Sequence, residues 1–370
     1  NSALGGLVAF YYLAYVPVQV PVGLMMDKWG PRKILTFACG CCAVGTLLFV
    51  NDYLALAKFG RFIVGFGSAF AYVGVLKIAS LWLPRKYFAM VAGICTTLGM
   101  VGAVSGEVLM HKLSEIYGWR DTLFYSFVIG IILMCVLWIF IRNKANKEFI
   151  VKGRASHEER STWSELKEVA RNKAIWIVGG IGCLFYLTLS AFAEMWAVPF
   201  LEANNLSRQN AAFGSSLVFI GFAVGGPIWG WLSDFVSSRK IPLILGGLLS
   251  TICAFWIVCF IPDNVYLLYV LLFLTGAFSS AEVLVFAVGN DVVAPRLKAT
   301  AVAFVNMGVM LGGMALQPLV GVMLDHLVIG NATPGLSEYN SAMLIMPIGL
   351  LLGTILSFML QETYHNYKKV

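Results

Sequence analysis

Long apolar runs separated by short polar segments form most of the chain. These runs approach or exceed the length of about 20 residues that an α-helix needs to cross the hydrocarbon core of a bilayer. They predict eleven transmembrane helices, at residues 4–26, 34–50, 55–82, 87–110, 122–141, 174–200, 211–232, 241–261, 264–290, 299–324 and 342–360. The pattern therefore predicts an all-α polytopic membrane protein.

One polar loop occurs twice, each time at the end of an apolar run. Residues 23–33, GLMMDKWGPRK, recur as residues 230–240, GWLSDFVSSRK. Four residue types of the two copies are displaced by the same 207 positions: Gly23, Asp27, Arg32 and Lys33, and Gly230, Asp234, Arg239 and Lys240. Equivalent loops at one offset indicate a duplicated membrane protein.

The same offset places the counterpart of span 174–200 before residue 1. We therefore expect that the natural protein has twelve spans and that this chain lacks the first. The expected domains are an N-terminal bundle of residues 1–141 with helices 2–6 of the complete fold, a linker of residues 142–173, and a C-terminal bundle of residues 174–370 with helices 7–12.

Composition and charge add an orientation to this picture. Hydrophobic residues make up 59% of the chain and charged residues 12%, against about 25% charged residues in soluble proteins. Most of the 26 Lys and Arg residues fall in alternate loops, and the positive-inside rule assigns these loops, the linker and the C-terminus to the cytoplasm. The net charge of +7 therefore does not indicate a nucleic-acid partner.

The eight Cys residues lie inside predicted spans and the four His residues lie in loops or tails. We therefore expect no metal site, no disulfide framework and no histidine proton relay within the membrane. The end of the linker places Trp163, Leu166 and Val169 at helical spacing, with Ser161 or Ser164 as the N-cap. An amphipathic helix on the inner membrane surface and a solvated linker with a short helix both fit.

The repeated loop carries a family resemblance. In the major facilitator superfamily of secondary transporters the corresponding loop reads G-x-L-x-D-[RK]-x-G-[RK]-[RK], which residues 23–33 resemble. The second copy has Ser237 where Gly30 stands in the first. The resemblance covers essentially the whole chain. It implies two pseudo-symmetric six-helix bundles, of which eleven of twelve helices are present here, and alternating access to a midplane site.

The two loops are predicted to form a conformational latch. Asp27 ends a helix at the inner interface, where its carboxylate can pair with Arg32 or Lys33, or cap the positive N-terminus of a neighbouring helix. Such a contact exists in only one arrangement of the two halves, and the resemblance implies that it stabilises the outward-facing state. The alternative is ordinary positive-inside charge with a turn glycine, against which two copies at one offset argue.

Arg61 lies inside a predicted span, followed by Gly65 and Gly67. The segment is similar to the family pattern R-x-x-Q-G-x-G-x-A, with Val64 in place of Gln, and in relatives this Arg is linked to proton coupling or to structure near the cavity. An Arg in hydrocarbon needs a partner, although snorkelling to the outer interface remains open. The next span lacks the Pro and the last Gly of a run typical of antiporters, which argues against drug/proton exchange.

Ionisable residues inside spans are candidates for the solute path, because each is costly in lipid. Glu282 is far from both interfaces, and burial disfavours its charged form, so it is a candidate proton carrier; a structural hydrogen bond is the alternative. Glu194 could gate the outer mouth or reach water, and Lys77 could bind solute or snorkel to the cytoplasm. The polar and aromatic candidates on cavity helices are Tyr12, Gln19, Tyr186, Asn306 and Gln317.

These residues, with the family resemblance, predict secondary active transport of a small anionic or zwitterionic solute, such as a carboxylate, amino acid or peptide, by proton-coupled alternating access. The chain contains no Walker motif, and no motif assembles a nucleophile with a base, so ATP drive and enzyme activity are not expected. The alternative is a transporter-like receptor that signals through a partner protein. We expect a multi-pass monomer in the lipid bilayer of a bacterial inner membrane, with solute and protons as its partners and no cofactor.

Overall fold

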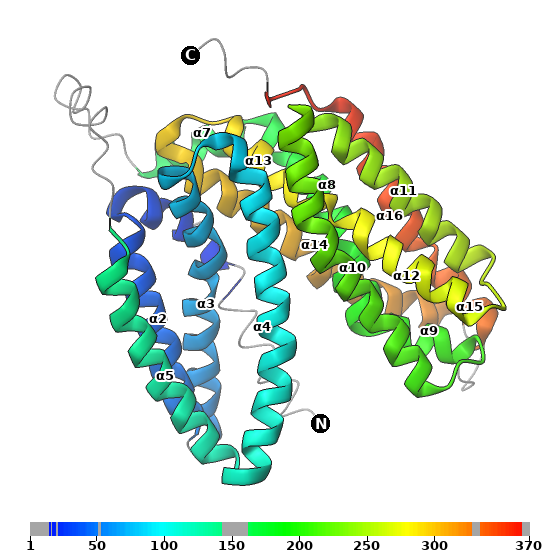
Figure 1. The fold of residues 1–370 in the computed structure, drawn as a ribbon, viewed down its shortest axis with the longest axis horizontal. Helices are drawn as coiled ribbons and strands as arrows, with labels where there is room; N and C mark the ends of the chain where they lie inside the picture. Colours follow the sequence, from blue (N-terminus) through cyan, green and yellow to red (C-terminus); the bar gives the residue numbers. More distant parts are fainter. Residues whose placement is uncertain are drawn as a thin grey trace. The chain divides into compact units, whose positions relative to one another are not determined.

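The computed structural model describes residues 15, 17–19, 21–50, 53–142, 162–327 and 334–364. Within these residues every regular element is a helix (Figure 1). A helix satisfies its backbone hydrogen bonds within its own segment, as a chain in hydrocarbon must. The fold class predicted from the apolar runs is confirmed.

The helices follow the predicted spans closely. The first part of the chain forms α2 (Pro31–Phe49), α3 (Leu54–Trp82), η1 (Arg85–Tyr87), α4 (Phe88–Tyr117), α5 (Trp119–Phe140) and α7 (Thr162–Arg171). The second part forms α8 (Lys173–Leu187), η2 (Thr188–Trp196), α9 (Ala197–Ala203), α10 (Arg208–Val236), α11 (Lys240–Cys259), α12 (Val265–Ser279), η3 (Ser280–Val283), α13 (Leu284–Asp291), η4 (Pro295–Leu297), α14 (Lys298–Leu327), α15 (Leu336–Met343) and α16 (Ile345–Met359). The predicted span 4–26 falls largely outside the described residues. Its described end is helical, and this helix continues to residue 29.

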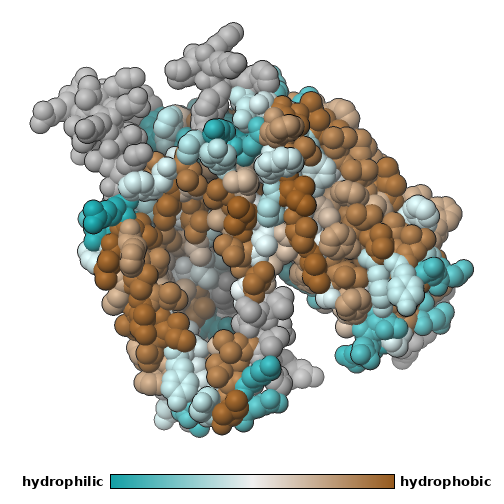
Figure 2. All heavy atoms as spheres, in the orientation of Figure 1, coloured by the Kyte–Doolittle hydropathy of each residue, from teal (hydrophilic) through white to brown (hydrophobic). Residues whose placement is uncertain are grey.

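Nine helices, or runs of helices, in the described part of the chain are long and apolar enough to cross a membrane. Helix α5 is the most apolar of them, with a mean hydropathy of 2.6, and its apolar stretch is not buried within the structure. Figure 2 shows hydrophobic side chains along this helix. An exposed apolar surface of this extent is typical of contact with lipid.

The contacts between helices divide the chain into two compact units. The first comprises Asn1–Pro84, Gly102–Asn172 and Val293–Met307, and the second comprises Arg85–Val101, Lys173–Val292 and Gly308–Val370. In the first unit α2 packs against α3 and α5; in the second α10 packs against α12, and α11 against α12 and α16. Each unit includes a short segment from the other half of the sequence. The domains 1–141, 142–173 and 174–370 stay a prediction.

Two spans of the second unit contain turns that are not α-helical. The π-helix η2 separates α8 from α9, and the 3-10 helix η3 separates α12 from α13. The wide turns of η2 leave carbonyl groups to other helices: the Ser215 hydroxyl donates to the Ala193 carbonyl at 2.8 Å, and the Gln317 amide donates to the Ser190 carbonyl. Such interruptions are frequent at functional sites, and η2 and η3 contain Glu194 and Glu282.

The predicted helix at the end of the linker is α7. Its residue Val169 is fully buried. Arg296, from η4, donates to the Glu168 carboxylate at 2.6 Å and lies 3.7 Å from the Glu165 carboxylate. This end of the linker is therefore part of the first unit, where Val169 is buried and Arg296 pairs with its two glutamates.

Candidate functional site

The Asp27 carboxylate caps the N-terminus of α14, which comes from the other half of the sequence. Its Oδ2 accepts hydrogen bonds from the Thr300 backbone N–H and hydroxyl, both at 2.9 Å, and its Oδ1 accepts from the Ala299 N–H at 3.3 Å. The first turn of α14 contains no acidic residue of its own. Asp27 therefore supplies, from another helix, the negative charge that a helix N-terminus favours.

Lys77 supplies the cation beside this carboxylate. Its Nζ lies 2.6 Å from Asp27 Oδ1, and the two side chains are only 8% and 5% exposed. The ammonium of Lys77 thus points to a buried partner rather than extending to the cytoplasmic surface. The amides and hydroxyl at the start of α14 and the Lys77 ammonium together give both oxygens of this buried carboxylate two donors each, which offsets the cost of burying it.

Gly23 explains how the helix before Asp27 comes so close to α14. A Cβ added at Gly23 would lie 2.6 Å from the Ala299 carbonyl oxygen and 2.5 Å from Thr300 Cα. Residues four apart share one face of a helix, so the spacing of Gly23 and Asp27 places the small residue and the capping carboxylate toward the same neighbour. Any side chain at Gly23 would separate the carboxylate from the amides that it caps.

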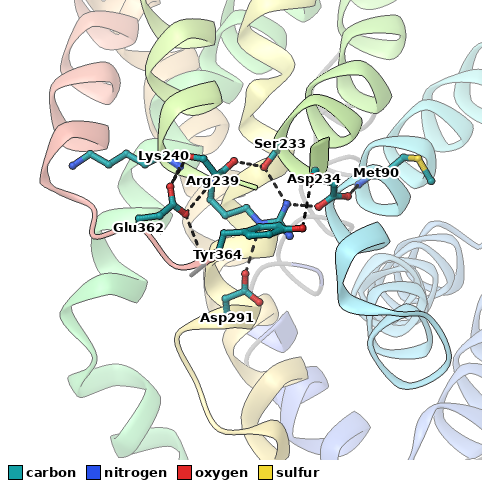
Figure 3. A network of polar contacts seen from close by, with 9 residues as sticks. Met90, Ser233, Asp234, Arg239, Lys240, Asp291, Glu362 and Tyr364 are labelled. Carbon is teal, nitrogen blue, oxygen red and sulfur yellow. Dashed lines mark hydrogen bonds and ion pairs between the residues drawn. The ribbon is translucent and has the colours of Figure 1, made fainter. Parts of the chain in front are cut away.

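The second copy of the loop repeats this geometry at α4. Asp234 Oδ2 accepts from the Met90 N–H at 3.4 Å, and Asp234 Oδ1 accepts from Arg239 Nη1 at 2.6 Å (Figure 3). Arg239 also donates to the Ser233 hydroxyl at 3.0 Å, and its Nε lies 3.6 Å from the Asp291 carboxylate. Here the loop's own arginine is the cation, and it is shared between two carboxylates.

The glycine positions of the second copy follow the first. A Cβ added at Gly230 would lie 2.6 Å from Met90 Cα, the counterpart of the close approach at Gly23. After the helix, Gly30 has φ 77° and Ser237 has φ 55°. The two turns differ in ψ, which is 158° at Gly30, in a region essentially restricted to glycine, and 39° at Ser237, in the left-handed helical region. The serine copy therefore keeps a positive φ, at a backbone cost of about 1 kcal/mol, but not the backbone conformation of the first loop.

The segment after α16 completes the second network. Glu362 accepts hydrogen bonds from the N–H groups of Arg239, Lys240 and Tyr364 at 3.0, 3.3 and 2.9 Å, and from the Ser238 hydroxyl at 2.5 Å. It caps the N-terminus of α11. Burial by itself raises the pKa of the Glu362 carboxyl, but these hydrogen bonds outweigh burial and lower the pKa below its ordinary value of 4.5.

Arg32 and Lys33 lie at the beginning of α2. The Arg32 Nε donates to the Trp138 carbonyl at 2.9 Å, and its guanidinium carbon lies 4.2 Å from the centroid of the Trp138 ring. The two copies of the loop therefore differ. Arg239 pairs with the aspartate of its own loop. Arg32 contacts Trp138 at the end of α5, and the buried ammonium near Asp27 comes from Lys77.

Glu282 is 3% exposed in η3, and its Oε1 has no hydrogen-bond partner among the described residues. This carboxyl oxygen lies 3.9 Å from the place where a Cβ at Gly182 of α8 would stand. The surrounding contacts are apolar, with Val285 and Val309 beside the same glycine. A buried carboxyl oxygen without a hydrogen bond in such surroundings can be satisfied by a proton or a polar ligand.

Arg61 and two amides are the corresponding groups of the first unit. The Arg61 guanidinium lies 5.0 Å from the Phe49 ring centroid, and its buried Nε has no hydrogen-bond partner in the described part of the chain. Gln19 is fully buried with neither amide atom bonded, and Asn306 is 2% exposed with an unbonded Nδ2, again counting described residues only. Donors of this kind suit a carboxylate or hydroxyl ligand.

The remaining candidates are distributed over the second unit. Gln317 donates to Glu194 at 3.2 Å, and its carbonyl accepts from Trp196 Nε1 at 3.2 Å, so α14 is bonded to η2. Tyr186 packs edge-on against Phe222, with ring centroids 6.2 Å apart. Tyr12 lies outside the described residues. The structure thus brings together Asp27 with Lys77, Asp234 with Arg239, and Glu194 with Gln317.

The residues of these networks that were not predicted include Thr300, Asp291 and Glu362. Asp291 is the first residue after the predicted span 264–290 and Glu362 the second after the predicted span 342–360, on the membrane side to which the charge pattern assigns Asp234. That shared depth is a signal that could have identified them. Thr300 gave no such signal, because a threonine at a helix start is an ordinary residue. No group of three metal-ligating side chains occurs among residues that the structure describes.

Comparison with known families and proteins gives one consistent result. The sequence model described as Major Facilitator Superfamily matches residues 1–201 and again residues 184–369. The probable galactarate/D-glucarate transporter GarP of Escherichia coli K12 is 24% identical over 390 residues, covering 95% of this chain and 84% of GarP. GudP of the same strain, with the same description, is 25% identical over 288 residues, covering 68% of this chain and 64% of GudP, just under two thirds of that relative.

Solved structures show the same fold. The crystal structure of a variant of the Escherichia coli fucose:proton symporter FucP has a TM-score of 0.77 at 18% identity, covering 98% of this chain and 92% of FucP. The proton:xylose symporter XylE bound to 6-bromo-6-deoxy-D-glucose has a TM-score of 0.69 at 14% identity, covering 98% of this chain and 87% of XylE. At these identities the likeness concerns the arrangement of helices and not the solute.

Proposed function

Since the chain belongs to the major facilitator superfamily, we propose that it is a proton-coupled secondary transporter of a small organic anion, of the sugar-acid class. Two relatives in Escherichia coli K12 are named as probable galactarate/D-glucarate transporters, and a third, 22% identical over 275 residues, as a probable L-galactonate transporter. These named solutes are polyhydroxy carboxylates. They fall within the anionic solutes predicted from the charged residues of the spans.

The observation that carries a transport role is the reciprocal capping by the two loops. Asp27, from the first half of the sequence, caps α14, and Asp234, from the second half, caps α4. Helix caps of this kind are lost when either helix moves away, so they stabilise one conformation over another. We assign the latch to the two loops: Gly23, Asp27, Arg32, Lys33, Gly230, Asp234, Arg239 and Lys240. We assign Lys77 to the latch, as the partner of Asp27, and not to solute binding.

The solute and the proton are assigned to the side chains that have buried polar atoms without a hydrogen-bond partner among the described residues. The Arg61 guanidinium is the donor for a solute carboxylate, because a charge-assisted bond matches its geometry, and the amides of Gln19 and Asn306 are donors for hydroxyl groups. Glu282 carries the proton. Glu194, Gln317, Tyr186 and Tyr12 remain further candidates. The linker and the C-terminus are placed in the cytoplasm by the positive-inside rule.

The proposal is tested by uptake of labelled D-glucarate and galactarate into proteoliposomes with an imposed pH gradient. We expect accumulation that collapses when a protonophore dissipates the gradient. A thermal-shift measurement with the same acids gives binding independently of flux. Binding without flux would instead favour the receptor alternative, and neither binding nor flux with any sugar acid would reject this solute class.

Glu282→Gln separates proton coupling from solute binding. The amide has nearly the shape of the acid but cannot exchange a proton, so we expect pH-driven uptake to be lost while counterflow exchange of the same solute continues. Glu202→Gln is the matched control, since Glu202 in α9 is exposed. Retained pH-driven uptake by the Glu282→Gln variant would show that another group carries the proton.

A further inference from the structure

A pocket of 460 Å³ lies at the beginning of α2 and the end of α5, within the first unit. Its described lining consists of Arg32, Lys33, Trp138, Ile139 and Arg142. Three of these five side chains are cations, and none carries a negative charge. A concave site with this lining attracts an anion.

The aromatic wall of the pocket fixes one of its cations. The Arg32 Nε–H donates to the Trp138 carbonyl at 2.9 Å, and the guanidinium stacks on the Trp138 ring at 4.2 Å. Stacking and a backbone hydrogen bond already restrict the rotamers of Arg32. The side chain therefore loses less conformational entropy when an anion binds. Lys33 and Arg142 are exposed beside it. The pocket therefore combines one oriented guanidinium with two accessible cations.

The surface next to the pocket is hydrophobic. Ile139 and Phe140 at the end of α5 are 63% and 77% exposed, and Ile132 and Val136 continue an exposed apolar stripe along the helix. Figure 2 shows hydrophobic side chains along α5 with hydrophilic ones gathered at its end near α2. Trp138 lies at the junction, as tryptophans do at a membrane interface. The site is thus cationic at the predicted cytoplasmic boundary and apolar toward the hydrocarbon.

We propose that this pocket binds an anionic phospholipid, with the headgroup phosphate on Arg32, Lys33 and Arg142 and an acyl chain along the exposed stripe of α5. A soluble phosphate ester would use the cations but leave the adjoining apolar stripe without a role. A zwitterionic lipid would bring its own cationic group to a pocket that is already lined by three cationic side chains, which is electrostatically unfavourable. Basic pockets on the cytoplasmic side of helical membrane proteins suit anionic headgroups. The inference does not depend on the solute.

The test is native mass spectrometry of the protein exchanged into equimolar phosphatidylglycerol and phosphatidylcholine. We expect preferential retention of phosphatidylglycerol by the natural sequence, and a loss of about fivefold in that preference for each charge removed by Arg32→Gln and Arg142→Gln. Lys86→Gln is the matched control, because it removes an exposed lysine of the same predicted side whose ammonium lies 4.8 Å from the Tyr87 ring. It should leave the preference unchanged.

Addition of glycerol 1-phosphate or inorganic phosphate distinguishes the two sources of the anion. Retention of phosphatidylglycerol against a large excess of either supports a lipid site, and displacement by either overturns it in favour of a soluble phosphate site. Equal lipid retention by the natural and Arg32→Gln/Arg142→Gln proteins, or an equal loss in Lys86→Gln, also overturns the proposal. If the double variant does not fold, Lys33→Gln/Arg142→Gln, which alters only exposed side chains, decides in the same way.

Discussion

Two buried aspartates are paired with cations that come from different parts of the chain. Arg239, five residues after Asp234, pairs with it inside one loop, whereas the ammonium near Asp27 comes from Lys77, 50 residues away in α3. Both solutions satisfy the same requirement, because a buried carboxylate without a cation or several donors is strongly unfavourable. The equivalent positions of a duplicated protein can thus share a function while their supporting contacts differ.

Lys77→Met tests the first of these pairs. The substitution leaves Asp27 buried beside a neutral side chain, so we expect a loss of about 3–5 kcal/mol in the free energy of unfolding, measured in detergent. Lys77→Met combined with Asp27→Asn should lose less than Lys77→Met alone, because the uncompensated charge is gone. Lys86→Met, at an exposed position, should change stability by less than about 0.5 kcal/mol. Equal losses in the single and double variants would contradict the pairing.

Glu362 gives the second network a dependence on pH. Its pKa is lowered in the folded protein, so its contribution to stability is present above the ordinary pKa of 4.5 and is lost as the pH falls through the lowered value. We expect Glu362→Gln to melt below the natural protein near neutral pH, and the difference to shrink as the pH falls below 4.5. A difference that is constant over this range would show that the carboxylate charge is not the cause.

Sequence patterns predicted some of these residues and not others, for physical reasons. Asp27, Asp234 and Arg239 were found because a duplication places the same chemistry at one offset. The pairing of Lys77 with Asp27 was not, because depth along a single helix says nothing about which neighbour a side chain faces. Asp291 and Glu362 were missed because acidic residues at a membrane boundary need no partner to be tolerated there.

At the scale of helices, hydropathy predicted where spans lie but not where they change form. The runs 174–200 and 264–290 are predominantly apolar along their whole length, yet they contain the π-helix η2 and the 3-10 helix η3. The difference arises in tertiary structure, where Ser215 of α10 and Gln317 of α14 bind carbonyls of η2. The mean hydropathy of one segment contains no information on hydrogen bonds from other helices.

Close helix packing in the second unit is tested by two glycine substitutions. A Cβ at Gly221 of α10 would collide with the Phe273 carbonyl oxygen of α12, whereas one at Gly180 of α8 would make an ordinary 3.5 Å contact with Leu356. We expect Gly221→Ala to destabilise by about 1–3 kcal/mol. Gly180→Ala should be neutral or stabilising by up to about 1 kcal/mol, since alanine favours a helix. Thermal unfolding of both variants in one detergent measures the contrast, and a similar loss in each would contradict it.

For the whole molecule, the sequence predicted a duplicated fold, and the structure adds which parts of the two halves contact each other. The beginning of α14 belongs to the same unit as Asp27, and the beginning of α4 to the same unit as Asp234. The sequence left two options for each loop aspartate: pairing with a basic residue of its own loop, or capping a helix of the other half. Both options occur together at Asp234.

Hydrogen exchange can test this reciprocal capping without knowledge of the solute. The Thr300 and Met90 amides each donate to a carboxylate from the other half, at 2.9 and 3.4 Å. Losing a hydrogen bond to a charged group costs about 1.5–3 kcal/mol, so we expect Asp27→Asn to speed exchange at the start of α14 by roughly tenfold to a hundredfold while α4 keeps its protection. Asp234→Asn should show the opposite pattern. Asp263→Asn, in an exposed loop, serves as control, and unchanged protection of α14 in Asp27→Asn would exclude the first latch.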